Sequence, residues 1–424
     1  MSTTRLAWMS RAIAVTGTVA LLTAGGITTA QAGSAEGNGT GHAIGNSSHQ
    51  SVPPGQRGRL LRSTKLTGAT VLPSAASNRL VRYVSVGAQG RRIEVTGAVA
   101  IPRGKAPAGG WPVISWAHGT VGNADQCTPT RQDGGYIGTV SQTLDRYVAA
   151  GYAVVQTDYE GLGTPGVHPY LNGQSAANTV VDIVRAARAL NPHVGKNYVV
   201  MGHSQGGHSA LWTAAQSGPR RDVRLLGAVA LSPGGHNLKV TTSYFSAIPY
   251  MPRAQAIAVL AFLPTILSGA EAADPSIDAA AMLIPEAQPL LEVGRNGCID
   301  DSYAVAEQVY AAAPRNPFAD GTETEQAKLT AYLDSQASEH LRLRVPTMVV
   351  SSWGDTLVDP ATQVNPLIPR LCASSRPLVD YLLLGSPPAT GPDHRTTVAA
   401  SYGEARAFAD AVFAGRTPAK HQAC

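Results

Sequence analysis

A serine, Ser204, stands at the centre of the pentapeptide GHSQG (202–206), directly after an apolar run. A serine hydroxyl becomes an effective nucleophile only when a neighbouring base accepts its proton. A strand that turns sharply into a helix lifts such a serine clear of a sheet, and the turn leaves no room for side chains at the positions that Gly202 and Gly206 occupy. The pattern therefore predicts that Ser204 is a nucleophile and that the backbone N–H of Gln205 points at the oxyanion formed during acyl transfer.

The base expected to accept the serine proton is His394, which lies between the last predicted strand and the last predicted helix. The carboxylate expected to orient its imidazole is Asp355, at the turn directly after another predicted strand. Asp359 is the alternative acid, but it precedes Pro360 and could instead begin a helix, because acids stabilise a helix N-terminus. The order serine, acid, histidine along the chain is typical of a serine on a strand-to-helix turn.

A second oxyanion donor is expected in the loop after an earlier predicted strand, where the sequence reads HGT from His118. Gly119 would let the backbone approach the substrate, and the N–H of Thr120 is the expected donor. His118, like His203 and His208 beside the serine, is expected to make structural contacts instead of acting as a base.

The elements that must position these residues alternate between apolar, β-like runs and helical patterns after Pro102. This alternation predicts a mostly parallel sheet with helices on both faces, preceded by an antiparallel hairpin at 79–86 and 91–101. The predicted parallel strands are 113–117, 153–157, 198–202, 225–231, 347–351 and 379–384. The predicted helices are 139–150, 176–190, 206–216 and 396–413.

The alternation stops at about residues 236–341, which are helical in pattern and rich in Ala, Leu, Ile and Pro. Because this segment lies between two predicted strands, it is expected to form a helical cap or lid over the carboxyl ends of the strands, where α/β sheets bind ligands. The expected fold class is α/β, with one domain at 59–424 that includes the cap.

The N-terminal 32 residues have the features of an export signal, since Arg5 and Arg11 precede a short apolar stretch and AQA supplies small residues at the cleavage spacing. A membrane anchor is the alternative, but the stretch is shorter than the roughly 20 apolar residues that span a bilayer. Residues 33–58, rich in Gly, Ser and Asn, are expected to be a disordered leader. No later segment is expected to span a membrane, so the mature chain is expected to be soluble and secreted.

The composition, with 424 residues of which 44% are hydrophobic and 14% charged, supplies enough apolar material for a core. A net charge of +5 is too mild to favour nucleic acid as a partner. Four cysteines in a chain expected to be exported indicate two disulfides with three possible pairings; they are Cys127, Cys298, Cys372 and Cys424. They lack the paired short spacings of zinc sites, so no metal is expected.

Together these stretches resemble the secretory lipase family (LIP-type) of α/β-hydrolases, over most of the chain from about Leu60 onward. DYEGLGT (158–164), followed by HPYL (168–171), is the most discriminating part of the resemblance, because general acyl-transfer chemistry does not require it. The other matching stretches are the HGT loop with Cys127 after it, the GHSQG turn, and the loops of Asp355 and His394.

The resemblance implies hydrolysis of lipid-like esters, a helical lid and no metal or organic cofactor. It also implies disulfides that pair Cys127 with Cys298 and Cys372 with Cys424. Members of the family vary in the oxyanion loop, so Gly119 is the alternative donor to Thr120.

The expected function is that of a secreted lipase or carboxylesterase that forms an acyl-enzyme on Ser204. An acyltransferase or a peptidase on the same scaffold is the closest alternative, and a non-catalytic secreted binding protein is a more distant one. The expected partners are an acyl-ester or lipid substrate and, transiently, a lipid interface, with no stable protein partner.

Overall fold

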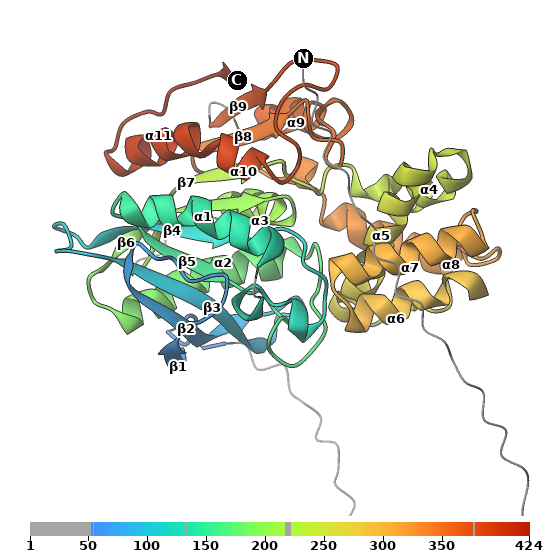
Figure 1. Ribbon diagram of the computed structural model, residues 1–424, viewed down its shortest axis with the longest axis horizontal. Helices are drawn as coiled ribbons and strands as arrows, with labels where there is room; N and C mark the ends of the chain where they lie inside the picture. Colours follow the sequence, from blue (N-terminus) through green and yellow to red (C-terminus); the bar gives the residue numbers. More distant parts are fainter. Residues whose placement is uncertain (1–51, 54, 133, 217–221, 376–377) are drawn as a thin grey trace, which may run out of the picture. The chain divides into compact units, whose positions relative to one another are not determined.

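The computed structural model describes residues 52–53, 55–132, 134–216, 222–375 and 378–424. The expected export signal and residues 33–51 of the expected leader lie outside the described residues. In the part described, one sheet holds ten strands in the spatial order β1-β2-β3-β5-β4-β6-β7-β8-β9-β10 (Figure 1). The strands are β1 (Leu60–Lys65), β2 (Ala75–Val86), β3 (Arg92–Pro102), β4 (Trp111–Ala117), β5 (Ala153–Thr157), β6 (Val194–His203), β7 (Arg224–Leu231), β8 (Thr347–Ser352), β9 (Val379–Leu384) and β10 (Gln422–Ala423).

The central strands of this sheet run parallel. β5, β4, β6, β7, β8 and β9 pair in parallel with their neighbours in this order, whereas β1, β2 and β3 form an antiparallel extension and β10 is antiparallel to β9. The mostly parallel sheet predicted from the alternation of strands and helices is therefore confirmed. The predicted hairpin is the β2–β3 pair, in which Val86 lies opposite Arg92.

Two layers of helices cover the sheet. Successive side chains of a strand point to opposite faces, so apolar side chains on both faces must be buried. On β6, Val199 and Met201 pack in one cluster with α1 and α11, whereas Val200 packs in another with α2, α3 and α9. The helices of these layers are α1 (Gly135–Ala149), α2 (Gly173–Leu190), α3 (Gln205–Ala215), α9 (Leu367–Ser375), α10 (Thr397–Ala400) and α11 (Tyr402–Phe413).

The segment between β7 and β8 is helical and builds a core of its own. Figure 1 shows its helices gathered beside the sheet, from yellow-green α4 to orange α8. They are α4 (Thr241–Ser246), α5 (Arg253–Ala273), α6 (Gln288–Asn296), α7 (Ile299–Ala312) and α8 (Glu323–Ser335). Most of the buried side chains of this core, including Leu260, Leu267 and Leu290, come from these helices and the turns between them, and we refer to residues 238–335 as the cap.

Short turns of other helix types connect these elements. The 3-10 turns are Asp125–Cys127, Pro129–Arg131, Leu238–Val240, Ile248–Tyr250, Pro285–Ala287 and Ser338–His340, and a π-helical turn spans Pro360–Val364.

Helix α5 corrects the expectation that no segment after the leader could span a membrane. It has 21 residues and a mean hydropathy of 1.7 over its most apolar window, so its length and composition alone would allow it to cross a bilayer. However, 61% of that window is buried inside the protein, where it packs against α6 and α7. A helix that is apolar on most sides is also what the centre of a helical core requires, and α5 has that position here.

Several elements differ from the prediction, including the short strand β10, which was not predicted. The single helix expected at 396–413 is split into α10 and α11 at Ser401, whose hydroxyl donates to the carbonyl of Thr397; such bonds to the preceding turn bend helices. Strand β1 was not predicted, because LLRSTK has neither a continuous apolar run nor a clear alternation. Helix α9 was not predicted either; it packs its apolar side chains Leu367 and Leu371 beside β9.

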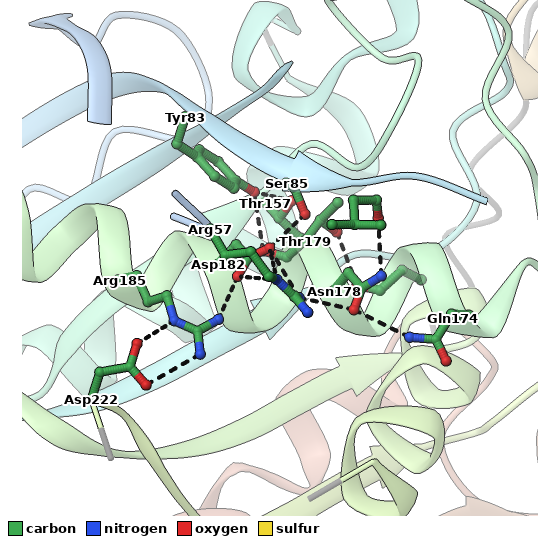
Figure 2. A network of polar contacts seen from close by, with 12 residues as sticks. Arg57, Tyr83, Ser85, Thr157, Gln174, Asn178, Thr179, Asp182, Arg185 and Asp222 are labelled. Atoms are coloured by element: carbon green, nitrogen blue, oxygen red, sulfur yellow. Dashed lines mark hydrogen bonds and ion pairs between the residues drawn. The ribbon is translucent and has the colours of Figure 1, made fainter. Parts of the chain in front are cut away.

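A buried polar network ties the residues before β1 to helix α2 (Figure 2). The side chain of Asp182 is fully buried and lies 3.0 Å from the guanidinium of Arg57 and 2.5 Å from that of Arg185. The hydroxyl of Ser85 on β2 donates to the same carboxylate at 2.7 Å. Arg57 belongs to the expected leader, so the folded body in the described residues begins before the expected boundary.

Candidate active site

The GHSQG turn joins β6 directly to α3 with Ser204 between them. The backbone of Ser204 has φ 59° and ψ −117°, a left-handed conformation that a non-glycine residue adopts only at some cost. A Cβ atom on Gly202 would lie 2.1 Å from the carbonyl oxygen of Gly206, and one on Gly206 would lie 1.9 Å from the carbonyl oxygen of Ala117. Both glycines are therefore required by close backbone contacts, as the sequence pattern predicts.

Asp355 and His394 form a hydrogen-bonded pair across two loops, one after β8 and one after β9. The Nδ1 atom of His394 lies 2.8 Å from Oδ2 of Asp355. The other carboxylate oxygen of Asp355 accepts from the N–H groups of Leu357 and Val358 at 3.0 and 2.8 Å, and the side chain is fully buried. Because each of these bonds is one that a carboxylate accepts, Nδ1 of His394 donates to Asp355, and Nε2 is the ring nitrogen that remains to accept a proton.

Asp359, the alternative acid, has a different environment. Its carboxylate accepts hydrogen bonds from the N–H of Ala361 and the hydroxyl of Thr362, each at 3.0 Å, at the start of the π-helical turn Pro360–Val364. Asp359 therefore caps this turn, and in the described residues it makes no hydrogen bond to a histidine.

Ser204 and His394 line the same pocket, which has a volume of about 290 Å³. The sheet side supplies Gly119, Thr120, Val121, Gln126, Gln132, Gly135, Tyr136, His203, Leu357 and Arg395, and the cap supplies Phe262, Cys298, Ile299, Asp300 and Tyr303. No hydrogen bond joins the Ser204 hydroxyl to His394 in the described structure; such bonds are often loose in the absence of substrate and tighten with it.

The HGT loop reaches this pocket through Gly119 and Thr120. A Cβ atom on Gly119 would lie 2.9 Å from the hydroxyl of Tyr136 and 3.2 Å from Nδ1 of His203. A larger residue here would therefore crowd these two side chains. The N–H of Thr120 has no hydrogen-bond acceptor among the described residues, and its hydroxyl pairs with that of Tyr170 at 2.8 Å.

Gln205, the first residue of α3, has a backbone N–H without an acceptor in its own helix. Its buried side chain has a second function, because its amide nitrogen lies 2.7 Å from Nε2 of His168. His168 in turn donates from Nδ1 to the carbonyl of Glu160 at 2.8 Å. Burial lowers the pKa of His168 to about 3, so its ring is neutral and its Nε2 accepts from the amide.

The DYEGLGT stretch thus has a structural function that the sequence did not reveal. The hydroxyl of Tyr159, whose backbone has φ 68°, donates to the carbonyl of His118 at 3.0 Å. The ring of Tyr159 also stacks on His168 at 5.6 Å. The stretch therefore supports both the HGT loop and, through His168, the residue after Ser204.

His118 and His208 make structural contacts. His118 contacts the carbonyls of Gly119 at 2.7 Å and Asp158 at 3.4 Å, and His208 donates to the carbonyl of Gln336 at 2.8 Å. Burial lowers the pKa of each of these two imidazoles to about 4, so both are neutral near pH 7 and neither contacts Asp355.

The two disulfides have the pairing that the family resemblance implies: Cys127 with Cys298 and Cys372 with Cys424. The first joins the HGT side of the pocket to the N-terminus of α7 in the cap. Beside it, the N–H of Ile299 donates to the carbonyl of Val121 at 3.0 Å, and a Cβ atom on Gly122 would lie 2.6 Å from Cα of Cys298. This part of the cap is therefore closely attached to the loop after Thr120.

One group of side chains in the described residues could in principle bind a metal ion. Oxygen and nitrogen atoms of Asp334, Glu339 and His340 lie within 4.8 Å of one another. His340 already pairs with Asp334 at 3.2 Å, and Glu339 accepts from the N–H of Asn237 at 3.0 Å. These bonds account for the positions of the three side chains.

Several pocket residues were not identified from the sequence. Tyr136 lies in the first turn of α1 and approaches His203 only because α1 packs against the sheet. Phe262 and Tyr303 come from different cap helices, and their rings meet edge to face at 6.3 Å. Arg395 follows His394 in sequence, and that neighbourhood is the one signal that could have identified it.

Comparison with known proteins agrees with the fold. A model of the alpha/beta hydrolase fold family matches residues 117–381. Among solved structures, the chain is similar to the rice cell wall degrading esterase LipA from Xanthomonas oryzae, with 19% identity and a TM-score of 0.64 over 85% of this chain and 100% of that one. It is also similar to lipase A of Candida antarctica, with 16% identity and a TM-score of 0.67 over 86% of this chain and 83% of that one. A search of curated proteins found no match.

Proposed function

We propose, because this chain belongs to the alpha/beta hydrolase fold family, that it hydrolyses carboxylic esters with Ser204 as the nucleophile. The observation that carries the proposal is the hydrogen bond of 2.8 Å between His394 and the buried Asp355, with His394 and Ser204 lining one pocket. Lipases and esterases among the structural neighbours support the same reaction class.

In the proposed mechanism the free Nε2 of His394 takes the hydroxyl proton of Ser204 as its oxygen bonds to the ester carbonyl carbon. The negative oxygen of the tetrahedral intermediate receives hydrogen bonds from the N–H groups of Thr120 and Gln205. His394 then returns the proton to the alkoxy oxygen, and the bond between that oxygen and the carbonyl carbon breaks. An alcohol leaves and an acyl-enzyme remains on Ser204.

Water completes the cycle by the reverse sequence. His394 takes a proton from water as the water oxygen bonds to the acyl carbon, and returns that proton to Ser204 as the acyl–serine bond breaks. Asp355 stays ionised and stabilises the imidazolium in both halves.

The acceptor of the acyl group separates the proposal from an acyltransferase or a peptidase. We expect wild-type protein to release p-nitrophenol and free butyric acid from p-nitrophenyl butyrate, and Ser204→Ala to lose this turnover by about a millionfold, to the background rate. If the acyl group went mainly to alcohols or amines added at low concentration in water, the protein would be an acyltransferase and not a hydrolase. Retained turnover in Ser204→Ala would remove Ser204 as the nucleophile.

A lipid-like substrate is part of the proposal. Phe262, Ile299 and Leu357 line the pocket and are suited to an acyl chain. The exposed large hydrophobic side chains in the described residues, Tyr250 at 89%, Tyr244 and Val240, all lie at the start of the cap, where they could contact a lipid surface.

This contact with a lipid surface can be measured directly. We expect wild-type protein to sediment with phosphatidylcholine vesicles and the double variant Tyr244→Ser, Tyr250→Ser to remain in solution, because tyrosine side chains favour the membrane interface. Turnover of a short soluble ester by the double variant is the control, since neither tyrosine lines the pocket. Equal sedimentation of both proteins would remove the lipid contact from the proposal.

Export and membership of the secretory lipase family remain part of the proposal. Two disulfides support an oxidising compartment, because such bonds persist there. The DYEGLGT stretch supports the family through its contacts with both the HGT loop and, by way of His168, Gln205. N-terminal sequencing of protein from culture medium, with a start near residue 33, is the expected result.

A further inference from the structure

We infer that His203, the residue before the proposed nucleophile, is a positioning residue that holds the main chain of His394, and that Tyr136 fixes its tautomer. The inference rests on the proposed function and adds a residue to it. It concerns the loop of the base, whose imidazole must lie within hydrogen-bond reach of the serine for proton transfer.

The first observation is a chain of hydrogen bonds through His203. Its Nε2 atom lies 2.7 Å from the carbonyl oxygen of His394, and its Nδ1 atom is bonded to the hydroxyl of Tyr136. A carbonyl can only accept, so Nε2 carries the hydrogen and donates it to His394. Nδ1 must then accept, and Tyr136 donates its hydroxyl hydrogen. The two bonds together select one tautomer of His203.

The environment of His203 agrees with a neutral ring. The residue is 1% exposed. Its burial, and in second place the nearby His394, hold the pKa of His203 well below its usual range. Neutrality matters because the rings of His203 and His394 lie only 4.5 Å apart. A charged His203 would repel the imidazolium that His394 becomes during catalysis.

The second observation is how little else fixes the main chain of His394. The imidazole is held by Asp355, but in the described residues the bond from His203 is the one hydrogen bond to the His394 backbone. The neighbouring residues are anchored separately, with Ser352 donating to the carbonyl of Pro392 at 2.6 Å and Thr397 donating to that of Asp393. His203 therefore adds the contact that fixes His394 relative to the strand that bears Ser204.

The HGT loop also contacts Tyr136 and His203, through Gly119. The site of a Cβ atom on Gly119 is taken by the Tyr136 hydroxyl and the His203 ring, at 2.9 and 3.2 Å. Burial raises the pKa of Tyr136, so its hydroxyl keeps the hydrogen that it donates to His203. The Tyr136–His203 pair, which includes the residue before Ser204, thus contacts both the HGT loop and the loop of His394.

Two substitutions at position 203 separate the two bonds. Gln places an amide nitrogen near the position of Nε2 and can still donate to His394, whereas Asn reaches only the position of Nδ1 and loses that donor. We expect His203→Asn to lower kcat for p-nitrophenyl butyrate about a hundredfold with KM changed less than about threefold, because a base displaced by about 1 Å costs about that much. We expect His203→Gln to retain kcat within about fivefold.

His208→Asn is the matched control, because His208 is also buried, neutral and bonded to a backbone carbonyl, but lies outside the pocket. It should lower the Tm by as much as His203→Asn does and leave kcat within about twofold. If His208→Asn lowered kcat as much as His203→Asn, or if Gln and Asn at position 203 were equally harmful, the effect would be general destabilisation and the inference would be overturned.

Tyr136→Phe tests the tautomer of His203 while the aromatic ring at position 136 is kept. If His203→Asn does not fold, this variant still tests the inference. We expect kcat to fall about tenfold, because His203 can then place its hydrogen on Nδ1 and lose the bond to His394. Nitrogen chemical shifts of His203 should show a single Nε2–H tautomer in the wild type and a mixture in Tyr136→Phe. A wild-type tautomer with hydrogen on Nδ1, or an unchanged kcat in the variant, would contradict the role given to Tyr136. Failure of the proposed function would instead appear as turnover by Ser204→Ala.

Discussion

The imidazole of His394 lies 2.8 Å from one oxygen of Asp355, and the other oxygen of that carboxylate accepts two backbone N–H groups, so the acid is fixed before any substrate binds. We expect Asp355→Asn to lower kcat about a thousandfold to ten-thousandfold, since an amide no longer holds the histidine tautomer or stabilises the imidazolium. Steady-state kinetics on p-nitrophenyl butyrate gives the measurement.

Asp359→Asn is the matched variant in the same loop. Because its carboxylate caps the turn at Pro360–Val364, the substitution should leave kcat within about twofold and cost less than about 1 kcal/mol of stability. The assignment of the acid would be reversed if Asp359→Asn were the more harmful of the two.

Acid should destabilise the protein because several imidazoles are buried without charge. Burial lowers the pKa of His118 and His208 to about 4 and that of His168 to about 3, and that of His203 is also low. Unfolded histidines titrate near pH 6.5, so below that pH the unfolded state binds more protons and stability is lost as the pH falls towards 4. Asp158 acts in the opposite direction, since burial raises its pKa to about 6 and the folded state keeps this proton.

Four histidines outweigh Asp158 and Glu160, whose pKa burial also raises, so a difference of about two protons remains and we expect the free energy of unfolding to fall by about 3 kcal/mol per pH unit near pH 5. Urea unfolding at a series of pH values measures this slope. His168→Gln removes one of the four titrating groups and should make the slope shallower. Stability that stayed level or rose between pH 6.5 and 4.5 would mean that these rings are charged in the folded protein.

The two disulfides should differ in their effect on activity. Cys127 and Cys298 are 171 residues apart and border the pocket, whereas Cys372 and Cys424 are 52 residues apart and lie away from it. Replacing either pair by serine should cost about 4 to 5 kcal/mol of unfolding free energy in the chain-entropy model, with about 1 kcal/mol more for the longer loop. Because the first pair joins the cap to the loop after Thr120, only its loss should also reduce kcat/KM in protein that remains folded. Equal activity of the two folded double variants would show that the cap stays attached without the bond.

Two opposite charges at the pocket should influence the choice of ester. Arg395 follows His394, and Asp300 lies in the first turn of α7 in the cap. Both are exposed, and in the described residues neither forms an ion pair. We expect Arg395→Gln to lower, and Asp300→Asn to raise, kcat/KM for mono-4-nitrophenyl adipate relative to 4-nitrophenyl hexanoate, each by about threefold to tenfold at low salt. These esters have acyl groups of the same length and differ in one terminal carboxylate. Shifts of the two variants in the same direction would mean that charge is not the cause.

The sequence predicted the parts of the site that depend on local pattern. Gly202 and Gly206 identify the turn at Ser204 because no side chain fits at either position, and β-like runs precede the loops of Asp355 and His394. Parallel strands bring their carboxyl ends to one edge of a sheet, so the order of these loops was enough to place their residues together.

The parts that could not be predicted depend on packing between distant elements. Tyr136 is 67 residues from His203 in the sequence, and nothing in either segment indicates the bond between them. Phe262 and Tyr303 enter the pocket because the cap helices pack on one another, and a helical pattern fixes which side chains are apolar but not which helix they meet. The function of DYEGLGT likewise became visible only with its contacts to His118 and His168.

The central claim is that His394, oriented by Asp355, activates Ser204. The most direct measurement is the rate and the site of labelling by a fluorophosphonate, which reacts with activated serines and requires no particular acyl group. The proposed mechanism predicts one adduct per chain, mapped by mass spectrometry to Ser204, and a labelling rate at least about a thousandfold lower in His394→Gln. An adduct on another residue, or an equal labelling rate in His394→Gln, would contradict it.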